Sequence, residues 1–310
     1  MDWGSLSIVG MLASLVGAST PILLAALGET VVEKSGVLNL GVEGMMITGA
    51  VTGFIAAVLS GNPWIGFIAG TLGGALLSGV FALLTQGFLT NHVATGLALT
   101  LFGLGLSAMI GQPYVGQKPP TVPDLNFGPL ADIPALGRIV FSHDAMVYIS
   151  VGLVIAVWYF LNRTRSGLIL RAVGENHDAA HGLGYRVVYV RVLAILFGGA
   201  LAGLGGAYLS LARVPQWTEG MTAGAGWIAL AIVVFASWRA GRVLLGAYLF
   251  GGITILQLNL QAAGMTLSPA YLSMAPYLMT IIVLVLISRN RASRSSQAPA
   301  SLGRIFYAPR

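Results

Sequence analysis

Long uninterrupted apolar runs constrain this chain more than any other feature of its sequence. Each run is close to the 20 or so residues with which a helix crosses the hydrocarbon core of a bilayer. The runs are continuous, unlike the alternating strands of a membrane β-barrel. Charged residues make up only 8% of the 310 residues, whereas a soluble domain carries roughly 25%. The sequence therefore predicts an all-α, polytopic integral membrane protein in contact with the lipid bilayer, and excludes a soluble enzyme and a nucleic-acid binder.

We expect about nine transmembrane helices, with eight or ten as alternatives. The nine candidate segments are 6–28, 45–60, 64–88, 93–111, 145–161, 192–212, 225–238, 243–261 and 270–287. With nine spans, 13 of the 16 Lys and Arg residues fall on one side of the membrane. Because cytoplasmic segments are rich in Lys and Arg, the N-terminus is expected outside and the C-terminus in the cytoplasm.

The predicted spans divide the chain into one domain and a tail. Residues 1–288 form a single transmembrane domain, and 289–310 form a basic cytoplasmic tail that is expected to touch anionic lipid headgroups. An external loop, 112–144, is rich in proline, which resists helix formation and favours an extended segment. The only sizeable cytoplasmic loop between spans is 162–191.

A short helix is expected within this cytoplasmic loop, over residues 175–183. Asn176 is a suitable N-cap, and Gly182 or Gly184 can end the helix. A short helix of small residues that projects from the membrane is a plausible docking element for a partner.

Three pairs of glycines lie four residues apart inside apolar runs, a spacing that allows close approach of helix backbones. We expect these glycines to pack within the chain. They are Gly49 and Gly53, Gly70 and Gly74, and Gly199 and Gly203.

Polar residues at membrane depth gather in segment 28–44, which reads GETVVEKSGVLNLGVEG. An ionised side chain in the hydrocarbon core costs at least ~2.5–3.5 kcal/mol. Two interpretations follow. The segment is either a water-exposed inner connection, or a broken helix that lines a cavity or gate, where irregular backbone is tolerated.

Motifs for nucleotide or metal chemistry are incomplete. The nearest match to a phosphate-binding loop is 28–35, where Glu33 replaces the second glycine and would repel phosphate. His177 and His181 have the spacing of zinc ligands, but Asp178 replaces the glutamate that the motif requires. We therefore expect no catalytic residue, no metal and no bound cofactor in this chain.

Four ordered blocks of sequence resemble one known family. They are GETVVEKSGVLNLGVEGMMITGA (28–50), NHVATGLALTLFGLGLSAMIGQPYVG (91–116), GLILRAVGENHDAAHGLGYRV (167–187) and TEGMTAGAGWIALAIVVFASWRAGRVLLGAYLFGG (218–252). These blocks are similar to the permeases of ABC importers for simple sugars and nucleosides, the ribose and branched-chain amino acid type. The resemblance covers about residues 10–288.

This resemblance implies a transmembrane subunit of an ATP-driven importer in a bacterial inner (plasma) membrane. Its partners would be ABC ATPase subunits, which carry ATP and Mg²⁺, a second permease subunit, often a paralogue, and an extracytoplasmic solute-binding protein. A nucleoside is favoured over a simple sugar, because the first block is nearest to nucleoside permeases. The resemblance places the coupling helix that docks on the ATPase at Gly174, Glu175, Asn176, Ala179, Ala180, Gly182 and Gly184.

The substrate path is predicted from chemistry alone. An uncharged sugar or nucleoside needs amide donors and acceptors and aromatic faces. Our candidates are Asn39, Glu43, Asn91, Phe102 and Trp217. The competing hypothesis is a stand-alone secondary transporter that uses Glu29, Glu33 and Glu43 as proton or cation sites.

Overall fold

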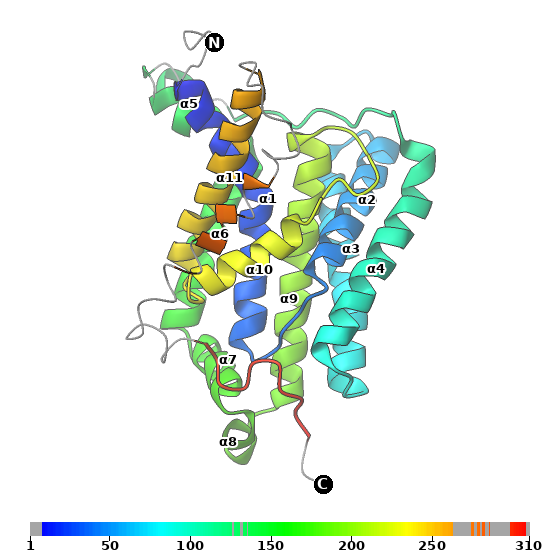
Figure 1. Cartoon of the computed structure of the whole chain (residues 1–310), viewed down its shortest axis with the longest axis vertical. Coiled ribbons are helices and arrows are strands. Elements are labelled where there is room, and N and C mark those ends of the chain that lie inside the picture. The colour runs from blue at the N-terminus through cyan, green and yellow to red at the C-terminus, as the bar shows by residue number, and fades with distance from the viewer. Residues whose placement is uncertain are drawn as a thin grey trace.

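The computed structural model describes residues 8–125, 127–130, 133–134, 136–262, 274–275, 278–279, 281–282, 285 and 298–307. Regular structure within these ranges is entirely helical (Figure 1). Most of the expected span at 270–287 lies outside the described residues, which there include only 274–275, 278–279, 281–282 and 285.

Seven helices in the described part of the chain are long and apolar enough to cross a membrane. They are α1 (Ile8–Lys34), α2 (Val42–Ser60), α3 (Pro63–Ala82) with the π-helical turn η2 (Leu83–Gly87), α4 (His92–Gly111), α6 (Ala145–Arg163), α9 (Val187–Tyr208) with the π-helical turn η5 (Leu209–Arg213), and α11 (Ala240–Ala262). The remaining elements are short: η3 (Gln112–Tyr114), η4 (Gly128–Leu130), α5 (Leu136–Val140), α7 (Arg165–Glu175), α8 (His177–Gly182) and α10 (Ala225–Phe235).

The expected span at 225–238 is not a full span. Helix α10 has 11 residues, so it is about 16 Å long at 1.5 Å per residue. A bilayer core is about 30 Å thick. Figure 1 shows α10 running obliquely across the bundle, and it packs against α1, α2 and α11.

Local signals set several helix ends. The side chains of Asn62, Asn91 and Asp144 accept hydrogen bonds from backbone N–H groups in the first turns of α3, α4 and α6. Such capping satisfies donors that have no partner inside the helix. Pro63 at the first position of α3 fits the same pattern.

Helix α9 packs against α1, α2 and α3 through small residues. A Cβ atom added at Gly49 would lie 2.3 Å from the Cα of Gly203, and one added at Gly74 would lie 2.2 Å from the carbonyl oxygen of Gly199. Backbones can approach this closely only where side chains are absent. The expected packing of these glycines within the chain is therefore confirmed.

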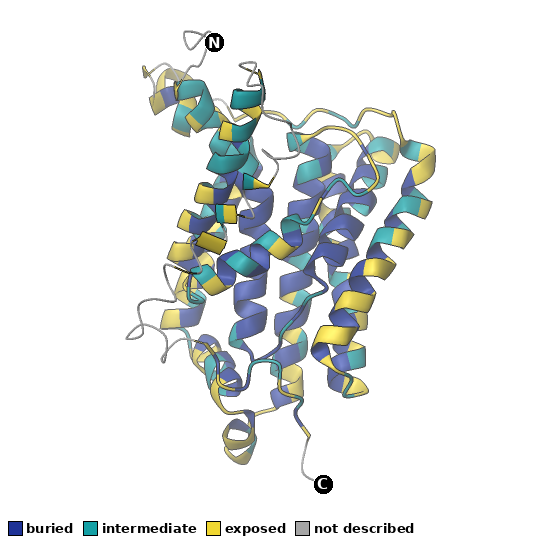
Figure 2. Ribbon diagram, viewed as in Figure 1, coloured by how far each residue is buried: buried dark blue, intermediate teal, exposed yellow. Residues whose placement is uncertain are grey.

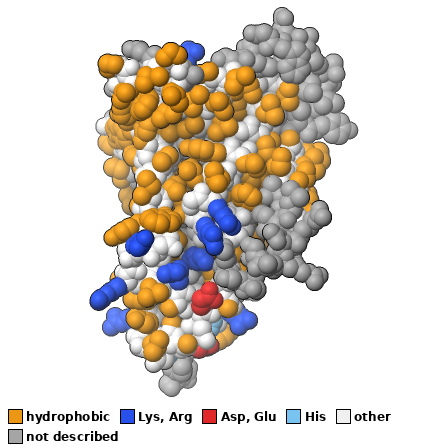
Figure 3. Space-filling model, turned by 90° about the vertical axis from the view of Figure 1, so that its left-hand side faces the viewer, with side chains coloured by type: hydrophobic (Ala, Val, Ile, Leu, Met, Phe, Trp, Pro, Cys, Tyr) orange, Lys and Arg blue, Asp and Glu red, His pale blue; other side chains and the backbone are white. Residues whose placement is uncertain are grey.

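Buried residues line the centre of the bundle, and the outer faces are exposed and apolar (Figure 2). Leu76 on α3 and Leu101 on α4, for example, are exposed leucines. On the face shown in Figure 3, a broad hydrophobic band lies above an end that carries Lys and Arg side chains. This distribution matches a membrane-embedded bundle with one basic end.

The two ends of the bundle differ. Helices α7 and α8 and residues 298–307 lie at one end, which we name the α8 end (Figure 1). The described residues of segment 112–144 lie at the opposite end and include the short helices η3, η4 and α5.

Candidate functional site

The expectation of a water-exposed connection at 28–44 is wrong. Helix α1 continues through Lys34, and the connection 35–41 runs from the α8 end back into the bundle before α2 begins (Figure 1). Glu29, Glu33, Asn39 and Glu43 are all at most 3% exposed. The segment is thus part helix and part irregular backbone buried within protein, which a membrane protein tolerates when its polar groups have partners.

Backbone groups of the connection are paired with side chains from α1, from α4 and from the connection itself. The N–H of Asn39 donates to Oε1 of Glu29 at 3.3 Å, and the Asn39 Oδ1 accepts from the N–H of Gly41 at 2.9 Å. The hydroxyl of Thr100 on α4 donates to the carbonyl oxygen of Leu40 at 3.0 Å. Asn39 therefore holds the shape of the connection and is fully buried.

Glu43, in the first turn of α2, binds the N-terminus of α10. Its Oε2 accepts from the N–H of Gly226 at 2.7 Å, and its Oε1 accepts from the N–H of Gly224 at 3.0 Å and from the hydroxyl of Thr222. A carboxylate at a helix N-terminus is favoured by the unpaired N–H groups and by the helix dipole. A Cβ on Gly226 would lie 2.6 Å from the Cα of Glu43, so glycine is required there.

Glu33 binds the turn at the other end of α10. Its Oε2 accepts from the indole N–H of Trp238, and the Lys34 Nζ lies 6.0 Å from the centre of the same indole ring. Ser237 and Trp238 have positive φ values of 51° and 55°, a conformation that is costly for residues with side chains. The bond to Glu33 helps to fix this turn. We name Glu33, Glu43, Thr222, Gly224, Gly226 and Trp238 the acidic clasp.

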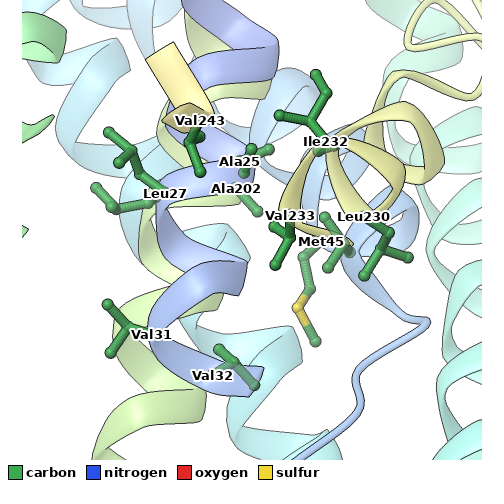
Figure 4. Packing of buried hydrophobic residues seen from close by; sticks show 14 of the residues in the cluster. Ala25, Leu27, Val31, Val32, Met45, Ala202, Leu230, Ile232, Val233 and Val243 are labelled. Atoms are coloured by element: carbon green, nitrogen blue, oxygen red, sulfur yellow. The ribbon is translucent and has the colours of Figure 1, made fainter. Parts of the chain in front are cut away.

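Between its two ends, α10 is held by apolar packing. Leu230 and Val233 of α10 lie beside Met45 of α2 (Figure 4), and Ile232 of α10 belongs to the same cluster of buried apolar side chains as Ala25 of α1. The first and fourth sequence blocks are thus brought together in one buried assembly, although about 180 residues separate Glu43 from Thr222.

The short helix predicted within segment 162–191 is confirmed. Helix α8 follows Asn176, whose Oδ1 accepts from the N–H of Ala179 at 2.9 Å, and Gly184 has a φ of +88° just after it. Glu175, Asn176, Ala179, Gly182 and Gly184 are exposed, whereas Gly174 and Ala180 are buried. Gly174 lies against the end of α1, where an added Cβ would be 2.2 Å from the Lys34 carbonyl oxygen.

The other predicted path residues lie apart from the acidic clasp. Asn91 is exposed and caps α4 through the N–H groups of Val93 and Ala94. Phe102 is 55% exposed on the outer face of α4, and Trp217 is buried against Gly111. Their roles in the path remain predictions.

A cavity of about 510 Å³ opens between α1, α6, α7 and α9. Its lining is almost wholly apolar and includes Val31, Phe160 and Phe197. A sugar or nucleoside needs convergent hydrogen-bonding groups, so this cavity does not suit such a solute.

Sequence reasoning missed Thr222, Trp238 and Arg191. Thr222 lies just before Gly224 and Gly226, at the start of an apolar run. Glycines at such a position can indicate a helix N-terminus that binds an anionic group, and this signal could have suggested the site. Nothing in the neighbouring sequence marks Arg191 as fully buried.

Comparisons with known proteins agree over most of the chain. The family model described as the permease component of branched-chain amino acid transport systems matches residues 11–284. A protein of Haloferax volcanii, provisionally named a glucose ABC transporter permease, is 41% identical over 89% of this chain and 90% of its own length. A nucleoside ABC transporter permease of Lactococcus lactis is 33% identical over 89% of this chain and 91% of its own length. A guanosine ABC transporter permease of Bacillus subtilis is 32% identical over 96% of this chain and 100% of its own length.

Proposed function

The chain belongs to the family of branched-chain amino acid transport system permeases, and on this premise we propose that it forms the membrane path of an ATP-driven importer for a nucleoside or a simple sugar. The observation that carries the proposal is the near full-length similarity to three relatives that are all named ABC transporter permeases. Two of these names specify a nucleoside or guanosine and one specifies glucose. The chain is accordingly a multi-pass membrane protein, which we assign to the cell inner (plasma) membrane.

The geometry supports an uncharged solute. The positive end of a half-helix such as α10 often binds an anionic substrate group in transporters. In this chain Glu43 already occupies that end with three hydrogen bonds. A neutral solute is therefore favoured over an anionic one. We place the path beside the connection 35–41 and α10, where discontinuous elements meet inside the bundle.

Energy input is assigned to a separate ABC ATPase, which would hold ATP and Mg²⁺. Helix α8, with its exposed residues and its glycine-bounded ends, is the proposed docking element on the cytoplasmic side. A second permease subunit would complete the bundle, and a solute-binding protein would deliver the ligand outside. A ligand shifts a two-state equilibrium only through unequal affinity for the two states, so the outward and inward forms must bind solute differently.

The alternative of a stand-alone secondary transporter finds no support in the relatives. Two of its three proposed ion-binding carboxylates also have other partners. Glu33 binds Trp238, and Glu43 binds the start of α10.

Docking through α8 is tested by co-purification of the ATPase with tagged protein from membranes. Leu183, directly after α8, is 77% exposed, so Leu183→Asp should remove the ATPase from the purified complex without disturbing the bundle. Leu130→Asp changes an exposed leucine at the opposite end and should leave the complex intact. Retention of the ATPase by the Leu183 variant at wild-type level would contradict the docking assignment.

A further inference from the structure

We propose that residues 298–307, the C-terminal strap, hold α8 in its docking orientation and link it mechanically to the buried connection 35–41. Phe306 is the principal positioning residue of the strap. The proposal rests on the proposed function, because it assumes that α8 receives force from an ATPase. It replaces the expectation that this part of the tail is solvated beside lipid headgroups.

Backbone hydrogen bonds join the strap to two separate elements. The N–H of Ser301 donates to the carbonyl oxygen of Gly174 at 2.9 Å, and the N–H of Gly303 donates to the carbonyl oxygen of Gly36 at 3.0 Å. The Ser301 hydroxyl also donates to the carbonyl oxygen of Glu175 at 3.2 Å. The strap therefore bridges the junction of α7 with α8 and the start of the connection between α1 and α2.

Phe306 packs directly on α8. Its ring centre lies 5.3 Å from that of His177 and 5.4 Å from that of His181, and the side chain is only 4% exposed. It completes a small apolar cluster with Val173, Ala180 and Val187. A helix of six residues makes few bonds of its own, so contacts such as this cluster fix the direction of α8.

Arg191 of α9 joins all these elements at one point. Its guanidinium donates from Nε to the carbonyl oxygen of Ser35 at 3.3 Å and from Nη1 to that of Arg304 at 3.1 Å. Its Nη2 donates to Nδ1 of His177 at 3.0 Å. One fully buried side chain thus contacts the connection, the strap and α8.

The consequence is a short route for movement. Gly36, which the strap holds, lies in the same connection as Asn39 and precedes the acidic clasp residue Glu43 by seven positions. A displacement of α8 by the ATPase would act through the strap on this connection. Loss of Phe306 should leave the ATPase bound but weaken the transmission of its movement.

The test uses the complete transporter, purified with its ATPase and reconstituted with its solute-binding protein, and measures solute transported per ATP hydrolysed. Phe306→Ala should lower this ratio at least about fivefold, the lower range of allosteric coupling, while the ATPase still co-purifies. Phe306→Tyr should restore most of it, since an aromatic ring remains. Tyr307→Ala, which changes an exposed neighbour, is the matched control and should behave as wild type.

Hydrogen–deuterium exchange over residues 174–184 provides a second readout that needs no transport. Exchange should be faster in the Phe306→Ala variant and unchanged in the Tyr307→Ala variant. Wild-type coupling together with wild-type exchange in Phe306→Ala would overturn the strap proposal alone. If no ATPase co-purifies with the wild-type protein, the proposed function is overturned instead.

Discussion

Oε2 of Glu43 lies 2.7 Å from the backbone nitrogen of Gly226, 183 residues later in the sequence, and so caps the half-helix α10. Together with Glu33 and Trp238 at the other end, this contact fixes α10 across the bundle. Two acidic residues of one short segment therefore position the discontinuous helix next to which we place the solute path.

Replacing Glu43 should destabilise the protein and stop transport. Glu43→Ala leaves the donors of Thr222, Gly224 and Gly226 without their acceptor, and each buried unpaired group costs about 1–3 kcal/mol. We expect a clear fall in the thermal unfolding midpoint in detergent and loss of uptake in proteoliposomes. Glu219→Ala, at an exposed site near the same helix, serves as the control and should match wild type. An unaltered midpoint in Glu43→Ala would show that the cap is unimportant.

Trp238→Phe should weaken the other end of the clasp. The substitution keeps an aromatic ring but removes the N–H that donates to Glu33, which leaves a buried carboxylate oxygen without that donor, at a cost of about 1–3 kcal/mol. The thermal midpoint should therefore fall. The same substitution at Trp227, which is 49% exposed on α10, should have little effect. Equal effects at the two positions would argue against the clasp.

The contact between α9 and α2 should not tolerate a methyl group at Gly206. An added Cβ would lie 1.8 Å from the carbonyl oxygen of Met46, and overpacking of this kind costs about 1–3 kcal/mol or more. Gly206→Ala should lower the folded yield and the thermal midpoint. Gly152→Ala on α6, where nothing lies within 4 Å, should leave both unchanged, and equal losses in the two variants would refute the packing argument.

Acid should loosen the strap. Burial, and next the charge of Arg191, lower the pKa of His177 below its ordinary value, while Asp178 opposes the shift and Arg304 adds to it. The docked imidazole is thus neutral, and its Nδ1 accepts from Arg191. When the strap is released, the imidazole of His177 takes up a proton as the pH falls through about 6.5. The packed strap is therefore fully stable above that pH and loses stability below it.

Hydrogen exchange of residues 300–304 at pH 7.5 and 5.5, corrected for intrinsic rates, measures this effect. Protection should be lower at pH 5.5 in the wild type. His177→Asn keeps an acceptor for Arg191 but does not titrate, so its protection should depend much less on pH. An equal loss of protection in both proteins would assign the effect to another group.

Local sequence patterns predicted the features that depend on nearby residues, namely apolar helices and helix ends. The apolar runs located α2, α3 and α9, and the helix α8 followed from its cap Asn176 and the glycines after it. The continuation of α1 through Glu29, Glu33 and Lys34 was missed, because such residues normally indicate a loop. Glu33 is stabilised there by Trp238, a partner 205 residues away, and no local pattern reveals such a contact.

The strap was missed for the same reason. The tail that contains it, 289–310, is basic and contains proline, which is typical of a solvated tail. Phe306 and the carbonyl group of Arg304 nevertheless have partners on α8 and α9. The apolar run at 225–238 likewise predicted a span. The helix in this run, α10, is shorter than a span because the glycines and the acidic clasp set its two ends.

The central claim is that this chain provides the path while a separate ATPase provides the energy. It is tested most directly in proteoliposomes that contain either the chain alone or the chain with its co-purified partners, supplied with the solute-binding protein and labelled guanosine or glucose. Our account predicts ATP-dependent accumulation of one of these solutes only with the complete set, and neither accumulation nor ATP hydrolysis with the chain alone. Accumulation against a gradient by the chain alone would contradict it.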